Sequence, residues 1–255
     1  MSQFKFLKNY LQNKKMSIKG EFITEDRIGF EKSNKALGYI YIEWYELISK
    51  FLSEIEGINI ELGCGASFID QINKTIKKTD VFLNSNTDFK LNAMDIGKNF
   101  ENKISNLILV NVFHHISDPE LFLKSAEKSL LVGGRIIMIE TSNNYWSRLV
   151  YKLIGHEPFD TKQIEWKFES KDPLLDSNQA LSWIVFERDY EKFKNLFPML
   201  SLIQKKNMMP FSYLLSGGHS FNTRIGKLIK ITRSFEKFFF DKNFGMFNLI
   251  CLEKI

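Results

Sequence analysis

Residues that could contact a nucleotide-like ligand follow a short apolar segment, Ile58–Leu62. The segment runs directly into a glycine turn, Gly63-Cys64-Gly65, and contains the acidic residue Glu61. Glycine suits such a turn because it adopts unusual dihedral angles and because a Cβ atom would hold the ligand away from the backbone. A strand with an acidic residue before Gly-x-Gly is typical of the ligand-binding edge of a doubly wound α/β sheet.

Further polar residues stand where later strands of the same sheet are predicted to end. Asp80 would end the second strand, where its carboxylate can accept hydrogen bonds from both hydroxyls of a ribose. Asp95 would end the third strand, where it can accept from an adenine amino group while the Ile96 backbone reaches a ring nitrogen. Asn111 follows the fourth strand and could line the pocket beside the reacting group. Alternatively, the two carboxylates are solvated acids or caps of the turns that follow.

His114 and His115 follow the predicted fourth strand, at the edge where parallel sheets bind ligands. A histidine is the natural base for a hydroxyl nucleophile because its ordinary pKa is about 6.5. His115 and His114 are therefore the catalytic candidates. In the alternative interpretation the pair is structural, with one ring packed or bonded to backbone. No pair of the four histidines has a zinc-site spacing, so no metal is predicted.

The residues after the glycine turn separate two ligand classes. A dinucleotide fingerprint, G-x-G-x-x-G, has a third glycine that lets its helix pack on the strand, and Phe68 stands in that place here. S-adenosylmethionine enzymes more often show E/D-x-G-x-G-x-G. The chain matches that pattern from Glu61 to Gly65, with Ser67 in place of the last glycine. The spacing favours S-adenosylmethionine over a dinucleotide.

With these residues, the chain resembles the class I S-adenosylmethionine-dependent methyltransferases, specifically their broad small-molecule group. The resemblance runs from about Ile58 to Glu140 and rests on four elements in order: Glu61-Leu62-Gly63-Cys64-Gly65, Asp95, Val112-Phe113-His114-His115-Ile116-Ser117-Asp118-Pro119 and Leu131-Val132-Gly133-Gly134-Arg135. Val132 stands where the family usually has proline, and Asn106 where it often has aspartate. The resemblance implies an α/β, Rossmann-like sheet of seven strands, mostly parallel with the last antiparallel, helices on both faces, and S-adenosylmethionine as cofactor.

The later half is similar to an uncharacterised bacterial subgroup of these enzymes, which is associated with surface-polysaccharide genes. The matching pieces are Ser147–Tyr151, His156–Asp160, Gln179–Phe186 and Met209–Gly218. The resemblance implies that the segment after the fifth strand forms the acceptor site. Its candidate substrate-binding residues are Glu140, Arg148, His156 and Asp160. Arg148, His156 and Asp160 lie in the insertion after Glu140, and as exposed helix charges they would need no function.

Hydrophobic periodicity predicts the elements that position these residues. Strands are predicted at 58–62, 77–83, 90–94, 105–111 and 135–140, with two more near 200–207 and 246–253. Helices are predicted at 37–56, 67–76 and 118–130, and Gly133-Gly134 is predicted to form the turn before the fifth strand. We divide the chain into an N-terminal helical cap, 1–56, and a methyltransferase domain, 57–255, with insertions at about 141–200 and 208–245.

Composition limits the partners. The 255 residues include two cysteines, Cys64 and Cys251, and carry a net charge of +5. Two cysteines give no disulfide framework, and neither a signal peptide nor a membrane span is recognised, so a cytoplasmic protein is predicted. The net charge is mild for a nucleic-acid binder, and no nucleic acid is predicted as a partner. The amphipathic, basic stretch 222–242 either packs its apolar face on the sheet or makes weak contact with the inner face of the membrane.

The expected function is methyl transfer from S-adenosylmethionine to an oxygen or nitrogen of a small-molecule or glycan/lipid-linked acceptor, leaving S-adenosylhomocysteine. An alternative is a non-catalytic S-adenosylmethionine-binding partner or scaffold with the same fold. A nicotinamide-dependent oxidoreductase is a third hypothesis, which Phe68 disfavours.

Overall fold

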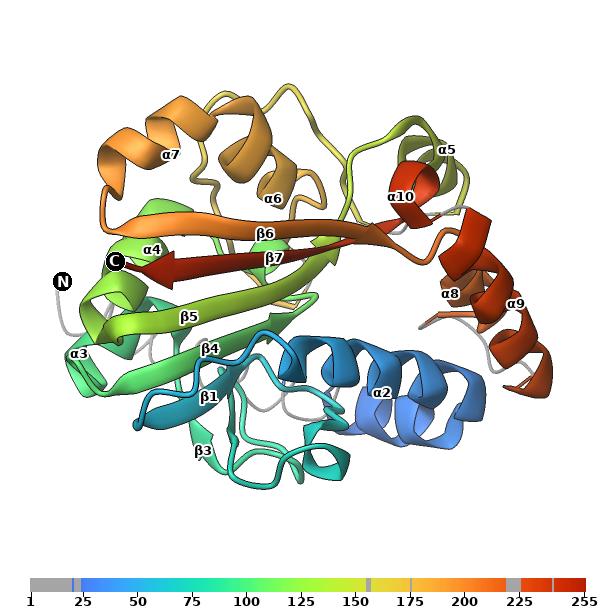
Figure 1. Cartoon of the computed structure of the whole chain (residues 1–255), viewed down its shortest axis with the longest axis horizontal. Coiled ribbons are helices and arrows are strands. Elements are labelled where there is room, and N and C mark those ends of the chain that lie inside the picture. Colours follow the sequence, from blue (N-terminus) through green and yellow to red (C-terminus); the bar gives the residue numbers. More distant parts are fainter. Residues whose placement is uncertain (1–19, 21–23, 155–156, 175, 219–225, 240) are drawn as a thin grey trace, which may run out of the picture.

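The computed structural model describes residues 20, 24–154, 157–174, 176–218, 226–239 and 241–255 (Figure 1). The elements are, in chain order, α2 (Lys35–Ser49), β1 (Ile58–Leu62), η1 (Ile69–Gln71), β2 (Lys77–Asp80), β3 (Phe89–Lys90), η2 (Ala93–Asp95), α3 (Ile96–Asn99), β4 (Ile104–Val110), η3 (Phe113–His115), α4 (Pro119–Ser129), β5 (Leu130–Thr141), α5 (Tyr145–Ile154), α6 (Leu181–Trp183), η4 (Ile184–Arg188), α7 (Tyr190–Leu196), β6 (Leu200–Met208), α8 (Ser212–Leu215), α9 (Gly226–Phe239), α10 (Asp241–Phe244) and β7 (Phe247–Lys254).

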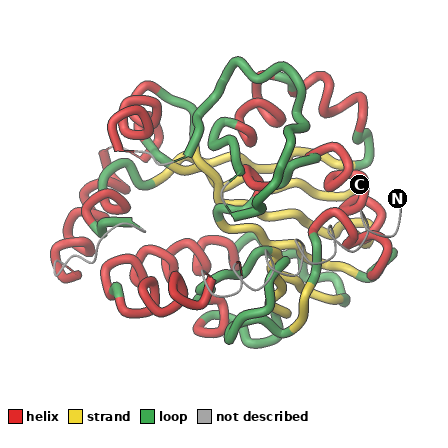
Figure 2. The backbone as a smooth tube through the Cα atoms, turned by 180° about the vertical axis from the view of Figure 1, so that it is seen from behind, coloured by secondary structure: helices red, strands yellow, loops and turns green. Residues whose placement is uncertain are grey.

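The strands form one seven-stranded sheet in the order β3-β2-β1-β4-β5-β7-β6. β1 to β5 pair in parallel, whereas β7 is antiparallel to both β5 and β6. Figure 2 shows the sheet from behind, with helices on both of its faces. The predicted fold class, a Rossmann-like sheet with its last strand antiparallel, is confirmed.

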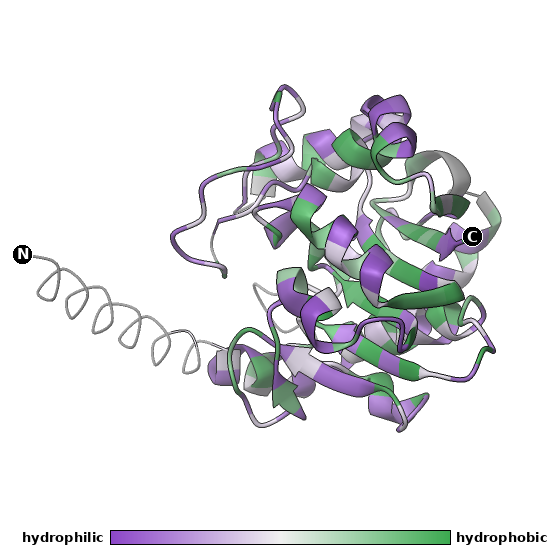
Figure 3. Cartoon of the chain, turned by 90° about the vertical axis from the view of Figure 1, so that its left-hand side faces the viewer, coloured by the Kyte–Doolittle hydropathy of each residue, from purple (hydrophilic) through white to green (hydrophobic). Residues whose placement is uncertain are grey.

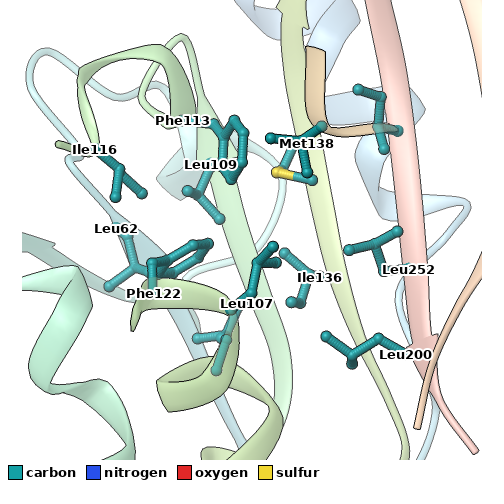
Figure 4. Close-up of a cluster of buried hydrophobic side chains, with 14 of the residues drawn as sticks. Leu62, Leu107, Leu109, Phe113, Ile116, Phe122, Ile136, Met138, Leu200 and Leu252 are labelled. Carbon is teal, nitrogen blue, oxygen red and sulfur yellow. The ribbon is translucent and has the colours of Figure 1, made fainter. Parts of the chain in front are cut away.

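Alternate residues of the central strands fill two separate cores. On one face Leu107, Ile136 and Leu252 pack with α4, η4 and α7 (Figure 4). On the other, Ile108 and Ile137 pack with α2 and α5. Figure 3 shows this pattern as apolar residues concentrated along the strands. The central strands of the sheet are therefore buried on both faces.

Helix α2 is shorter than the predicted helix 37–56. Asn34 caps its start by accepting from the backbone of Ala36 and Leu37, and the helix ends at Ser49. Beyond it, the Asn106 amide binds both backbone groups of Ser53, at 2.7 and 3.1 Å. These bonds hold the chain extended against β4, so the helix cannot continue to Gly57. The division of the chain at residue 56 stays a prediction.

The predicted helix 67–76 is wrong, because only the 3₁₀ turn η1 forms there. Ser67 accepts from the backbone of Ile69 at 3.1 Å, and the Asn73 side chain accepts from the backbone of Thr75 at 2.9 Å. Such local side-chain bonds offer the backbone an alternative to helix. The segment therefore leaves the glycine turn as a loop.

Three strands also differ from prediction in their bounds. The second, predicted at 77–83, ends at Asp80. The third strand is only β3, so Asp95 lies in η2 at the start of α3 and does not end a strand. The fifth strand begins at Leu130, and Gly133 and Gly134 lie within it. Gly133 has φ +80°, and the pairing of β5 with β4 shifts register around this pair. The two glycines thus form an irregularity inside β5 and not a turn before it.

The sheet ends at β3 and β6 among the described residues. β3 has two residues. β6 shifts register against β7 between Leu202 and Gln204, and it exposes Lys205 and Lys206. Both outer strands are thus short or irregular.

Among the described residues, helix α9 packs mainly on α2, α8 and α10 (Figure 1), and its buried Ile229 belongs to the core on that face of the sheet. Its buried side includes Arg233, which pairs with Glu43 and Asp241 at 2.8 and 2.6 Å. The outward residues Leu228, Ile231, Phe235 and Phe238 are half or more exposed. Contact of 222–242 with a membrane stays a prediction. None of the described helices is long and apolar enough to span a bilayer.

Candidate functional site

A cavity of about 930 Å³ opens at the carboxyl ends of the parallel strands. The sequence-predicted residues that line it are Gly63, Cys64, Gly65, Asp80, Asn111, His114 and His115. The turn after β1, the end of β2 and the segment after β4 supply them. Such an edge is where open α/β sheets bind ligands.

The glycine turn presents open backbone to this cavity. Gly63 and Gly65 have φ angles of +63° and +45°, which favour glycine. A Cβ atom at Gly63 would lie 2.7 Å from the Val112 side chain, whereas one at Gly65 would meet nothing within 4 Å. Gly63 is therefore required for packing, and Gly65 leaves space that a ligand can enter.

Two side chains from the neighbouring segment hold Gly65 in place. Its N–H donates to Asp80 Oδ2 at 3.1 Å, and its carbonyl accepts from the Asn86 amide at 3.1 Å. Asp80 ends β2 as predicted, and its other oxygen accepts from the Phe82 backbone at 3.2 Å. Burial raises the pKa of Asp80 despite these backbone donors. The carboxylate faces the cavity with acceptor capacity suited to sugar hydroxyls.

Glu61 lies behind the turn and does not line the cavity. Its side chain is buried and accepts from Ser67 Oγ at 2.6 Å and from the Tyr45 hydroxyl. Burial raises the pKa of Glu61 to about 7, although both hydrogen bonds oppose the rise. The residue thus connects β1, α2 and the turn.

We expect Glu61 to make folding stability depend on pH. Because its pKa is raised in the folded state, its contribution is complete below about pH 4.5 and is lost as the pH rises through 7. The loss should amount to about 3 kcal/mol. Urea unfolding of wild type and Glu61→Gln between pH 5 and 8 measures it, and the wild type should lose this stability relative to the variant. Parallel pH profiles would contradict the assignment.

Asp95 and Ile96 do not line the cavity. The Asp95 carboxylate is partly exposed and pairs with Lys98 at 2.5 Å, and Ile96 is buried in the core. The residues just before them, Asn92, Ala93 and Met94, line the cavity instead. The early end of β3 accounts for the difference, because η2 turns Asp95 outward.

The segment after β4 begins with a strained residue. Asn111 has φ +56°, and its N–H donates to the Ile139 carbonyl at 2.9 Å. Its side chain forms a hydrogen bond with the buried Tyr41 hydroxyl. This conformation turns the chain from β4 into η3, and so places both histidines on the cavity wall.

His114 lies between two carboxylates. Nδ1 donates to Glu140 Oε2 at 2.7 Å, and Nε2 lies 3.4 Å from Glu157 Oε2. Burial alone would lower the pKa of His114, but the two carboxylates outweigh it and raise the pKa to about 9. Both nitrogens are thus engaged by protein groups.

His115 has the opposite environment. Its Nδ1 lies 3.3 Å from the Asp176 carbonyl, and its Nε2 is 3.9 Å from Glu157 Oε2. Burial and the neighbouring charge of His114 lower the pKa of His115 to about 4. With Nδ1–H donated to the carbonyl, the neutral ring carries its lone pair on Nε2, on the side of Glu157.

Glu140 and Glu157 arrange the pair from opposite sides. Glu140 is fully buried at the end of β5, and its Oε1 accepts from the Val112 and Phe113 backbone at 2.9 and 2.7 Å. Glu157 lines the cavity, and burial would raise its pKa. The hydrogen bond and charge of His114 outweigh burial and hold it well below its usual range.

The insertion supplies further cavity residues. Gln179 donates to Glu157 Oε2 at 2.5 Å and binds Thr141, which also contacts the Tyr151 hydroxyl at 2.9 Å. Gln179, Tyr151 and Glu157 line the cavity. Gln179 opens one of the segments that match the bacterial subgroup, but that match gives it no role, and no motif points to Asn86; both act through contacts made only in the folded chain.

The predicted substrate-binding residues separate. Arg148 is exposed on α5 and Asp160 is exposed in the insertion, and neither lines the cavity. Glu140 lies behind the histidines and supports His114. His156 lies outside the described residues. These assignments stay predictions.

No family model and no curated protein matches the sequence. Among solved structures, an S-adenosylmethionine-dependent methyltransferase from Archaeoglobus fulgidus aligns with a TM-score of 0.52 at 11% identity. The alignment covers 88% of this chain and 98% of that one. The chain has the class I methyltransferase fold.

Two further similar structures align with TM-scores below one half. Geranyl diphosphate C-methyltransferase from Streptomyces coelicolor A3(2) gives 0.49 at 12% identity, with 84% of this chain and 78% of that chain covered. A possible histamine N-methyltransferase from Thermotoga maritima gives 0.47 at 16% identity, with 84% and 89% covered. At such identities the likeness concerns the fold and not the acceptor.

Proposed function

We propose that the protein transfers the methyl group of S-adenosylmethionine to an oxygen or nitrogen of an acceptor held in the same cavity. The observation that carries the proposal is the open Gly65 backbone, fixed to Asp80 on the cavity wall of a methyltransferase fold. An acidic strand end beside a glycine turn suits a nucleoside, with the sugar hydroxyls on the carboxylate.

The proposed cofactor position follows the cavity wall. The methionyl part lies over Gly63-Cys64-Gly65, the ribose on Asp80, and the adenine against Asn92–Met94. Asn111 is near the reacting group, and Glu61 supports the turn from behind. Asp95 and Ile96 take no direct part in this arrangement.

The acceptor would occupy the part of the cavity formed by the insertions and the N-terminal segment. Its wall combines polar residues such as Arg27, Tyr151 and Gln179 with apolar ones such as Leu174 and Met246. This mixture fits a small molecule or a glycan/lipid-linked acceptor with both polar and apolar parts.

The reaction needs little covalent chemistry from the protein. The acceptor lone pair attacks the methyl carbon, and the carbon–sulfur bonding pair returns to sulfur, which leaves S-adenosylhomocysteine. Holding the two groups in line and excluding water can supply about 7–11 kcal/mol. A hydroxyl acceptor must also lose its proton, and His115 Nε2 is the first candidate to accept it. His114 donates from Nδ1 to Glu140 and faces Glu157 from Nε2, so without a bound cation it serves to position the cluster.

Calorimetric titration with S-adenosylhomocysteine tests the proposal first. We expect micromolar binding, and its absence would refute the cofactor assignment. Substituting His115→Ala should then keep this binding and reduce turnover of a hydroxyl acceptor about 10²–10⁴-fold. His115→Gln serves as the size-matched control. Unchanged turnover in both variants would exclude the base role.

The alternative of a non-catalytic binding partner predicts cofactor binding without formation of S-adenosylhomocysteine in any cell extract. A nicotinamide enzyme is disfavoured because Phe68 fills the place of the third glycine, and its ring packs 5.7 Å from Tyr41. Fluorescence quenching by NADH and not by S-adenosylmethionine would revive it.

A further inference from the structure

Three side chains from two distant segments converge at one point of the cavity wall. The ring nitrogens of His114 and His115 and a Glu157 carboxylate oxygen all lie within 4.8 Å of one another. His114 Nε2 is 3.4 Å and His115 Nε2 is 3.9 Å from Glu157 Oε2. The second distance is too long for a hydrogen bond, so His115 Nε2 makes no direct hydrogen bond with Glu157.

Outer contacts fix the position of all three groups. His114 Nδ1 donates to the Glu140 carboxylate at 2.7 Å, and His115 Nδ1 is bonded to the Asp176 carbonyl at 3.3 Å. Ser177 and Gln179 donate to Glu157 Oε2 at 3.0 and 2.5 Å. Histidines that bind metals almost always donate their other ring N–H to a carboxylate or a backbone carbonyl, which fixes the tautomer and the ring orientation.

We propose that His114, His115 and Glu157 bind a divalent transition-metal cation, with the remaining coordination positions open to the cavity. Two imidazole nitrogens and one carboxylate suit zinc or iron(II) and leave room for further ligands. One cation would satisfy all three groups at once. The expectation from the sequence, that no metal binds, rested on spacing, and spacing does not detect ligands brought together from separate segments.

The metal site would also have a role in the proposed methyl transfer, and this role rests on the proposed function. An acceptor oxygen entering an open position would be polarised by the cation, which favours a hydroxyl acceptor over an amine. When the cation is bound, His115 Nε2 is a ligand and not the base, and the hydroxyl proton passes to water. Glu140 is then a positioning residue, since it contacts His114 and not the cavity.

The test uses the full chain after treatment with a chelator. Cobalt(II) reports binding through its visible absorption, and zinc is titrated by calorimetry. Glu157→Gln and His115→Ala should each weaken binding by about a hundredfold or more. The matched control is Glu165→Gln, an exposed carboxylate in the same segment, which should bind as the wild type does.

S-adenosylhomocysteine binding, measured on the same samples, separates the two proposals. We expect it to be retained in all three variants. Wild-type zinc affinity weaker than about 1 mM, or equal affinity in wild type and both cluster variants, would overturn the metal site. Retained metal binding without S-adenosylhomocysteine binding would refute the cofactor assignment and leave the metal site intact.

Discussion

Replacing Asp80 with asparagine should lower the affinity for S-adenosylhomocysteine about a hundredfold, or about 2.7 kcal/mol. Its carboxylate is buried on the cavity wall at the end of β2, where two charge-assisted hydrogen bonds to ribose hydroxyls would form. The same substitution at Asp95 should change the affinity less than about threefold. Asp95 is partly exposed, pairs with Lys98 and lies outside the cavity lining. Calorimetric titration of both variants measures the difference.

The pair Asp80→Asn and Asp95→Asn separates a ligand contact from a general effect of lost charge. Because Asp80 also accepts from the Gly65 backbone, near-UV circular dichroism must show that the variant keeps its fold. Equal losses at the two positions would contradict the cavity assignment. A larger loss at Asp95 would restore the interpretation made from the sequence.

Replacing Glu140 with alanine should destabilise the folded protein by about 3–5 kcal/mol. The side chain is fully buried, and it accepts from the Val112 and Phe113 backbone and from His114. Its removal leaves two backbone donors and the Nδ1–H of His114 without their acceptor at a fully buried position. Urea unfolding, followed by circular dichroism at neutral pH, measures the loss.

Two further variants show whether hydrogen bonding or charge dominates. Glu140→Gln keeps an oxygen for the backbone donors but turns an amide donor toward His114, so the loss should be smaller, about 1–3 kcal/mol. Glu120→Ala removes an exposed carboxylate paired with Lys124 and should cost less than about 1 kcal/mol. A Glu140→Ala variant as stable as Glu120→Ala would show that the buried network contributes little.

Much of the sheet and part of the site follow from local sequence signals. Short-range patterns predict the apolar strand before Gly63, the helix that begins after Asp118, and the polar residues that follow the fourth strand. The structure has all three as β1, α4 and the segment after β4. Asp80 and the histidine pair line the cavity because each follows or ends a strand of the parallel sheet. Strand ends of a parallel sheet share one edge, so predicting the strands locates their end residues.

The remaining site residues depend on contacts that no local pattern reveals. Ser67 and Asn73 redirect the backbone where helix was predicted, and the short β3 moves Asp95 away from the cavity. Glu157 and Gln179 come from an insertion without periodicity, and they matter only because it folds back over His114. Their roles follow from tertiary structure alone.

The outer strands of the sheet have a consequence for self-association. An exposed, regular strand is a template onto which another copy can add its own strand. Two-residue β3 is too short to serve. The displaced register of β6 disfavours a flat added strand, and its exposed Lys206 adds charge to that edge, whereas Lys205 pairs with Glu187. Concentrated solutions should therefore resist association by strand addition at these two edges of the sheet.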